Sequence, residues 1–135
     1  MRMITGIAHA CYVTSELERA IGFYRDKLGM TEAFPFVKPD GRKYGAYLHA
    51  GGRNFIEIFE GKTGPKAEGQ SYQHLCLEVD DIEKTVAAIR AKGVEVTDPK
   101  VGTDRSWQAW IADPDGNPIE LHHYTPESKQ RPWLK

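Results

Sequence analysis

The sequence predicts an α+β fold in which two βαβββ modules form a curved mixed sheet. A strand, a helix and three further strands are indicated in the first half of the chain, and the same order returns in the second half. Each helix ends at a glycine, Gly29 or Gly93, at nearly the same distance from the preceding strand. Because several independent offsets agree, the internal repeat is a stronger indication than any single residue.

The chain length sets the expected domain organisation. A chain of 135 residues is expected to form one domain, because a domain of this size buries a full apolar core. Module one is assigned to residues 4–61, a linker rich in Gly and Lys to 62–70, and module two to 71–125. The polar tail 126–135 contains two prolines and is expected to pack loosely or against a partner chain.

The first module begins with residues 6–13, whose alternation with period two is typical of a β-strand. A helix is expected from Ser15, because Ser15 and Glu18 have the spacing of a capping box. An apolar stripe at helical spacing continues to Leu28. Three strands are expected after this helix, at residues 31–37, 44–49 and 54–60.

The second module repeats this order, beginning with the strand "YQHLCLEV" at residues 72–79. A helix is expected from Asp80, because Asp80 and Glu83 have the same capping spacing. The stretch "DPDGN" indicates a turn with its glycine in the left-handed conformation. The three strands of this module are expected at residues 94–97, 106–112 and 118–124.

The composition argues against several classes of function. The 18 basic and 19 acidic residues nearly balance, and no basic stripe indicates a nucleic-acid partner. No apolar run is long enough to span a membrane, and the first residues lack the pattern of a signal peptide, so a cytoplasmic protein is expected. Two cysteines are too few for a disulfide framework, and we expect them to stay reduced.

One histidine and one glutamate occupy matching places in each module. His9 and His74 each lie six residues before the expected helix cap, and Glu57 and Glu120 lie on the last strand of their modules. Taken singly, each of these side chains would be interpreted as an ordinary strand residue. Taken together at duplicated positions, they predict a metal site, provided that the first and last strands of each module are neighbours.

Two imidazoles and two carboxylates suit a divalent transition metal such as Zn, Ni, Mn, Co or Fe. The two carboxylates offset the charge of the ion. Because nitrogen and oxygen donors of this kind leave positions open for water or substrate, the set is typical of a catalytic site. Ile7, His9 and Cys11 share one strand face, and Phe55, Glu57 and Phe59 share another, so each expected ligand has largely apolar neighbours, as in a lined pocket.

These motifs resemble the vicinal oxygen chelate superfamily, which includes glyoxalases, bleomycin-resistance proteins and ring-cleaving dioxygenases. The resemblance rests on "HACYVTSELERAIGFYRDKLGM", "FIEIFE", "HLCLEVDDIEKTVAAIRAKG" and "DPDGNPIELHHY", and it covers nearly the whole chain. The ligand order His, Glu, His, Glu is similar to that of glyoxalase I (lactoylglutathione lyase). The resemblance therefore implies a metal-dependent lyase or isomerase that acts on a small vicinal-oxygen substrate through an enediolate.

The resemblance also leaves other activities of the superfamily open. They are a ring-cleaving dioxygenase that uses Fe(II) or Mn(II), an epimerase, and a metal-free small-molecule binding or resistance protein. The chain also departs from the glyoxalases of bacteria that use glutathione. Those enzymes carry an Arg and an Asn where this chain has Val13 and Gly61, which argues against glutathione as the thiol.

The resemblance also implies roles for individual residues and a homodimer. A glutamate ligand, Glu120 or Glu57, would move a proton between substrate carbons, and the family favours Glu120. His122 has the same strand parity as Glu120, and His123 is expected to point the other way. The expected pocket residues are Cys11, Cys76, His122, Arg105, Trp107 and Phe36.

Overall fold

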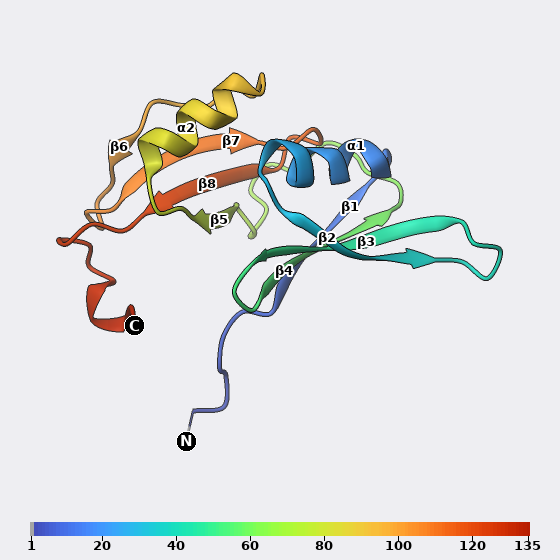
Figure 1. Ribbon diagram of the computed structural model, residues 1–135, viewed down its shortest axis with the longest axis horizontal. Helices are drawn as coiled ribbons and strands as arrows, with labels where there is room; N and C mark the ends of the chain where they lie inside the picture. Colours follow the sequence, from blue (N-terminus) through green and yellow to red (C-terminus); the bar gives the residue numbers. More distant parts are fainter. Residues whose placement is uncertain (1) are drawn as a thin grey trace. The chain divides into compact units, whose positions relative to one another are not determined.

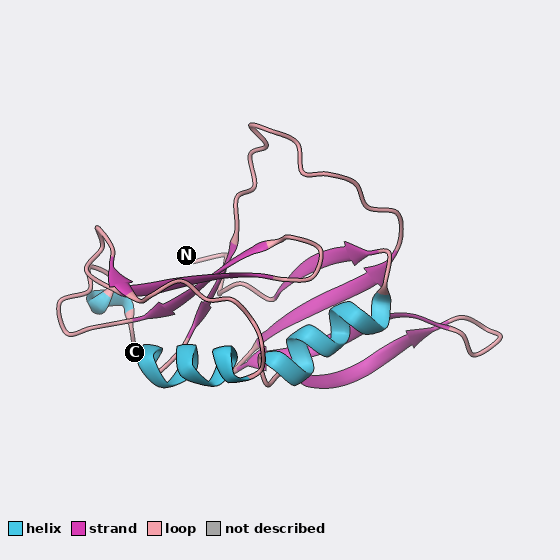
Figure 2. Ribbon diagram, turned by 90° about the horizontal axis from the view of Figure 1, so that it is seen from above, coloured by secondary structure: helices cyan, strands magenta, loops and turns pink. Residues whose placement is uncertain are grey.

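The computed structural model describes residues 2–135 and divides the chain into two compact units, Met1–Glu68 and Gly69–Lys135. Each unit contains one of the two expected modules. Strands make up most of the regular structure, as Figure 2 shows. None of the helices among the described residues is long and apolar enough to cross a membrane.

The first unit is a four-stranded mixed sheet in the order β1-β4-β3-β2, accompanied by one helix (Figure 1). β1 and β4 are parallel, whereas the pairs β4–β3 and β3–β2 are antiparallel. The helix continues from an α-helical into a π-helical turn before it ends. The elements in chain order are β1 His9–Thr14, α1 Leu17–Gly22, the π-helical turn Phe23–Lys27, β2 Thr31–Val37, β3 Lys43–Gly51 and β4 Asn54–Glu60.

The second unit repeats the topology of the first, with the order β5-β8-β7-β6. β5 and β8 are parallel, and the other pairs are antiparallel. The α+β class and the duplicated βαβββ order predicted from the sequence are thereby confirmed. The elements in chain order are β5 Leu75–Glu78, α2 Ile82–Ala91, β6 Lys100–Val101, β7 Trp107–Ala112, β8 Pro118–His123 and the short 3-10 helix Arg131–Trp133.

Each sheet packs one face against its own helix, and this packing forms the core of the unit (Figure 1). Because side chains alternate across a strand, every second residue of the central strands is buried. In the first unit the buried apolar and aromatic set is Leu17, Ala20, Ile21, Phe23, Tyr24, Ala46, Leu48, Ile56 and Ile58. In the second unit it is Ile82, Val86, Ile89, Ala109, Ile111, Ile119 and Leu121. The opposite face of each sheet is left for the polar and aromatic side chains of these strands.

Both helices begin slightly later than the sequence predicts. The cap position of α1 is Glu16 instead of Ser15, and its backbone N–H donates to the Thr14 hydroxyl over 3.1 Å. The cap of α2 is Asp81 instead of Asp80, and its carboxylate accepts from the Lys84 N–H over 3.0 Å. Two adjacent aspartates leave the first turn of α2 ambiguous in the sequence, whereas α1 begins without a side-chain cap from its own cap residue.

The expected strand at residues 94–97 is wrong. The short strand β6 lies further along, and Thr97 meets β7 through one backbone bond and one side-chain bond, both with Trp110. The strand expected at residues 72–79 is shorter and contains only β5. The glycine conformations are confirmed, because Gly29, Gly93 and Gly116 have φ angles of 79°, 83° and 81°.

The C-terminal tail is bound to the loop before β7 rather than loosely packed. The Ser106 and Ser128 hydroxyls are 2.6 Å apart, and the Thr125 hydroxyl donates to the Arg105 carbonyl over 2.7 Å. The Gln130 amide donates to Asp104 Oδ2 over 2.6 Å. The tail and this loop are therefore joined by one hydrogen-bond network.

We expect the stability of this hydrogen-bond network to fall in acid. The hydrogen bond from Gln130 lowers the pKa of Asp104 below its ordinary value. A lowered carboxyl pKa stabilises the folded state above the ordinary pKa of about 3.9, and this stabilisation is lost as the pH falls through the folded-state value. Replacing Gln130 with Ala should raise the pKa of Asp104, as followed by an NMR titration of its carboxyl carbon. An unchanged midpoint would contradict this account of the tail.

Candidate metal centre

The first His–Glu pair lies on the open face of the first sheet. His9 begins β1 and Glu57 lies in the neighbouring strand β4, with Nε2 and Oε1 3.5 Å apart. The parallel register places Cys11 directly opposite Glu57, so His9 reaches the carboxylate diagonally from one pleat away. The expectation that the first and last strands of a module are neighbours is confirmed in this unit.

The second unit forms an equivalent pair. His74 immediately precedes β5, and its Nε2 lies 3.2 Å from Oε1 of Glu120 in β8. Cys76 is opposite Glu120, as Cys11 is opposite Glu57. The side chains of His9 and His74 are 38% and 35% exposed, and those of the two glutamates are 18% and 12% exposed. The duplication therefore extends to the environment of each pair.

The distances within the pairs suit two donors on one ion. Metal–donor bonds of about 2.0–2.2 Å place neighbouring ligand atoms ~3.0–3.5 Å apart in tetrahedral or octahedral geometry. The two nitrogen–oxygen distances, 3.5 and 3.2 Å, fall in this range. Since an ion pair between His and Glu has similar dimensions, the distances alone fit both interpretations. The imidazole and carboxylate donors are those that bind divalent transition metals.

Each histidine is also held by an aromatic residue that the sequence reasoning missed. The Tyr47 hydroxyl lies 2.8 Å from His9 Nδ1, which leaves Nε2 directed at Glu57. In the second unit the rings of His74 and Trp110 meet edge to face at 4.7 Å. Tyr47 and Trp110 occupy equivalent places, because they pair with Glu57 and Glu120 respectively. The matching places of Tyr47 and Trp110 in the two modules were the sequence signal that could have identified them.

The two cysteine residues are partly exposed, but their thiols are partly shielded from water and are not activated. Burial of the thiol, followed by the carboxylate of Glu57, raises the pKa of Cys11. In the second unit burial and the charge of Glu120 raise the pKa of Cys76 to about 12. Because the thiolate is the nucleophilic and metal-binding form, both residues remain protonated near neutral pH. Their place beside the glutamates fits the expected role as wall residues.

The remaining expected pocket residues are distributed unevenly. Phe36 lies on the same face as Glu57, with its ring 5.0 Å from that of Phe59. Trp107 pairs with His123 on the opposite face from Glu120, and Trp110 stands on the Glu120 face instead. Arg105 lies in the exposed loop before β7. The remaining histidine of this strand, His123, points away as expected, because its Nδ1 accepts from the Ile82 N–H over 3.2 Å.

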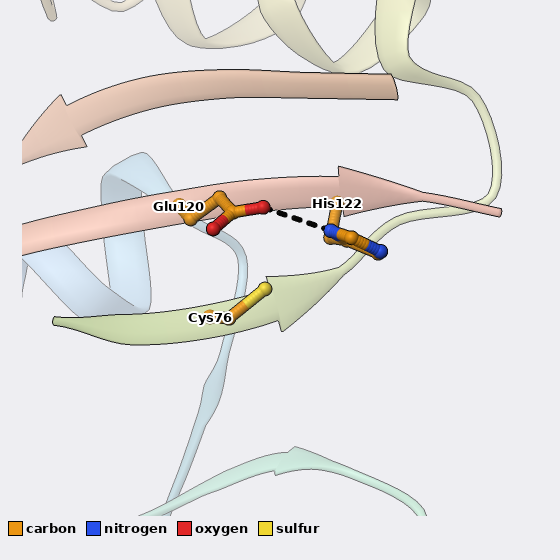
Figure 3. A group of neighbouring side chains, drawn as sticks. All are labelled: Cys76, Glu120 and His122. Atoms are coloured by element: carbon orange, nitrogen blue, oxygen red, sulfur yellow. Dashed lines mark hydrogen bonds and ion pairs between the residues drawn. The ribbon is translucent and has the colours of Figure 1, made fainter. Parts of the chain in front are cut away.

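His122 stands beside Glu120 and is buried. Figure 3 shows both side chains on β8, with Cys76 projecting toward them from β5. His122 Nδ1 is 2.8 Å from Glu120 Oε2. One potential ligand atom from each of the three residues lies within 4.8 Å of the others. Glu120 therefore contacts an imidazole through each of its two oxygens.

Comparison with known families agrees with this architecture. Residues 6–121 match the family described as the Glyoxalase/Bleomycin resistance protein/Dioxygenase superfamily. The chain therefore belongs to this superfamily, and its two βαβββ units have the vicinal oxygen chelate fold.

Individual relatives carry different activities in their names. The chain is 32% identical to a lactoylglutathione lyase from Haemophilus influenzae, over 85% of this chain and 90% of that protein. It is 30% identical to a metallothiol transferase, FosB, from Staphylococcus epidermidis, over 88% of this chain and 82% of that protein. The crystal structure of a glyoxalase family protein from Enterococcus faecalis has a TM-score of 0.76 at 25% identity, covering 90% of this chain and all of that one.

Proposed function

We propose that the chain is a divalent-metal-dependent lyase or isomerase of the glyoxalase I type. The observation that supports this most is the His–Glu pair that recurs in both units, with nitrogen–oxygen distances of 3.5 and 3.2 Å. His9, Glu57, His74 and Glu120 would hold the ion. In the superfamily such a set comes from one chain or from two chains of a dimer, and the proposal holds for both arrangements.

The residues of the chain would share the chemistry as follows. A bound divalent ion supplies Lewis acidity to two neighbouring substrate oxygens. Glu120 takes a proton from one substrate carbon and returns it to the next, and Glu57 is the second carboxylate of the site. The Tyr47 hydroxyl is hydrogen-bonded to Nδ1 of His9, which keeps Nε2 available as the atom that binds the metal. The reaction is an isomerisation and consumes no oxidant or reductant.

We also propose that the thiol part of the substrate is not glutathione. The positions that carry Arg and Asn in the glutathione-using glyoxalases are Val13 and Gly61 here, and they lie next to each other. A Cβ atom added to Gly61 would lie only 2.8 Å from Val13 Cγ1. This small apolar contact offers no charge or amide group to a peptide thiol.

An assay with methylglyoxal tests the proposal. Metal-loaded protein would be mixed with methylglyoxal and one of several thiols, including glutathione, cysteine and coenzyme A, and thioester formation would be followed. We expect thioester with at least one small thiol, and a weaker rate with glutathione. The matched control is Glu120→Gln protein loaded with the same metal. If metal-loaded protein forms no thioester with any thiol, the proposed reaction is wrong.

A second candidate is metal-dependent thiol transfer, favoured by the similarity to the metallothiol transferase. It would use the same metal site, and replacing methylglyoxal with a small epoxide in the assay separates it from the first candidate by its product. Transfer would join the thiol to an electrophilic carbon, such as that of a small epoxide, with ring opening and protonation of the released oxygen. Lyase activity would leave that epoxide unchanged.

A further inference from the structure

The two glutamates of the candidate metal centre differ in one respect that breaks the duplication. Glu120 contacts His74 through Oε1 over 3.2 Å and His122 through Oε2 over 2.8 Å. In the first unit Phe59 takes the place that His122 has in the second. Phe59 lies two residues after Glu57 on β4, and His122 lies two residues after Glu120 on β8. A phenyl ring donates no hydrogen bond, so Glu57 lacks the second imidazole that holds Glu120.

His122 is fixed in its own place. Its side chain is only 9% exposed, and a carboxylate only accepts, so Nδ1–H must be the donor toward Glu120. Nε2 is buried, has no hydrogen-bond partner among residues 2–135, and lies 3.6 Å from Asp104 Oδ2. The same oxygen of Asp104 accepts from the Gln130 amide over 2.6 Å. Figure 3 shows the second ring nitrogen of His122 on the side away from Glu120.

We propose that His122 is a positioning residue that orients Glu120 toward the metal. The inference rests on the proposed metal site. The hydrogen bond from Nδ1 fixes one carboxylate oxygen of Glu120, which leaves the other oxygen facing His74. Such outer partners are typically worth 10–100-fold in metal affinity.

The test is the affinity of the full chain for Co²⁺, measured by competition with a coloured chelator. His122→Phe introduces the residue found at the equivalent place of the first unit, Phe59. We expect the affinity for Co²⁺ to fall about 10–100-fold. His122→Asn keeps an N–H donor near the position of Nδ1 and should recover most of the loss. The matched control is His49→Phe, a histidine on the open face of the first unit that bonds the Gly52 carbonyl, and it should bind as wild type.

The outcomes separate this inference from the proposed function. Wild-type affinity in His122→Phe would overturn the positioning role and leave the metal site standing. Equal loss in His122→Asn and His122→Phe would overturn the role of the N–H donor. A wild-type chain that binds no Co²⁺ would overturn both the metal site and the inference. If His122→Phe does not fold, His122→Leu replaces it, because its side chain also donates no hydrogen bond to Glu120; weaker binding is expected, and unchanged binding would overturn the positioning role.

Discussion

Replacing Glu120 with glutamine is expected to lower the turnover number of the metal-loaded protein about 10²–10⁴-fold, the usual contribution of a positioned general base. The amide keeps the shape and one oxygen donor of the side chain but takes up no proton. Turnover would be measured at saturating metal with the methylglyoxal and thiol pair that wild type uses. Because the metal is saturating, a lower turnover number reports lost proton transfer and not weaker metal binding.

Glu78→Gln is the matched control for this change. Glu78 lies on the neighbouring strand and on the same sheet face, opposite His122, and its removal takes away the same charge. We expect its turnover number to stay close to that of wild type. If Glu57→Gln shows the large loss and Glu120→Gln a small one, the two glutamates have exchanged the roles proposed for them.

Replacing Ile58 with Ala is expected to cost about 2–5 kcal/mol in the free energy of unfolding of the first unit. Ile58 is fully buried in β4, between Glu57 and Phe59, and it points to the helix side of the sheet. The lost side chain leaves a cavity in the core. Urea unfolding followed by circular dichroism measures the change.

Val37→Ala provides the comparison for this core substitution. Val37 is 54% exposed at the end of β2, so its truncation should change the free energy of unfolding by no more than about 0.5 kcal/mol. Equal costs at Ile58 and Val37 would contradict the assignment of the buried and open faces. That assignment also places Glu57 on the open face, so the pair of variants bears on the site as well.

The sequence predicted much of the fold because its signals are local and repeated. The strands β2 and β4 match the predicted residues 31–37 and 54–60 at both ends. The helix starts and β6 were misplaced for a different reason. Asp80 and Asp81 stand side by side at the start of α2, and β6 has only two residues, too few for a period-two pattern to mark it in the sequence.

The candidate site was predictable in part. The repeat and the strand period were enough to propose that His9 meets Glu57 and His74 meets Glu120, and both pairs lie within 3.5 Å. The contact of Tyr47 with His9 was missed, because an aromatic residue in a strand normally indicates core packing. Asp104 was missed because it lies in a loop, and only the folded tail brings Gln130 to it.

The metal content of the purified chain tests the central claim most directly. Elemental analysis after loading and dialysis should give one transition-metal ion per chain, whether the four ligands come from one chain or from two. The double variant His9→Ala/His74→Ala should retain almost none. Two ions per chain would mean that each His–Glu pair binds its own ion. That result, no metal in wild type, or unchanged binding in the double variant would contradict the shared four-ligand site.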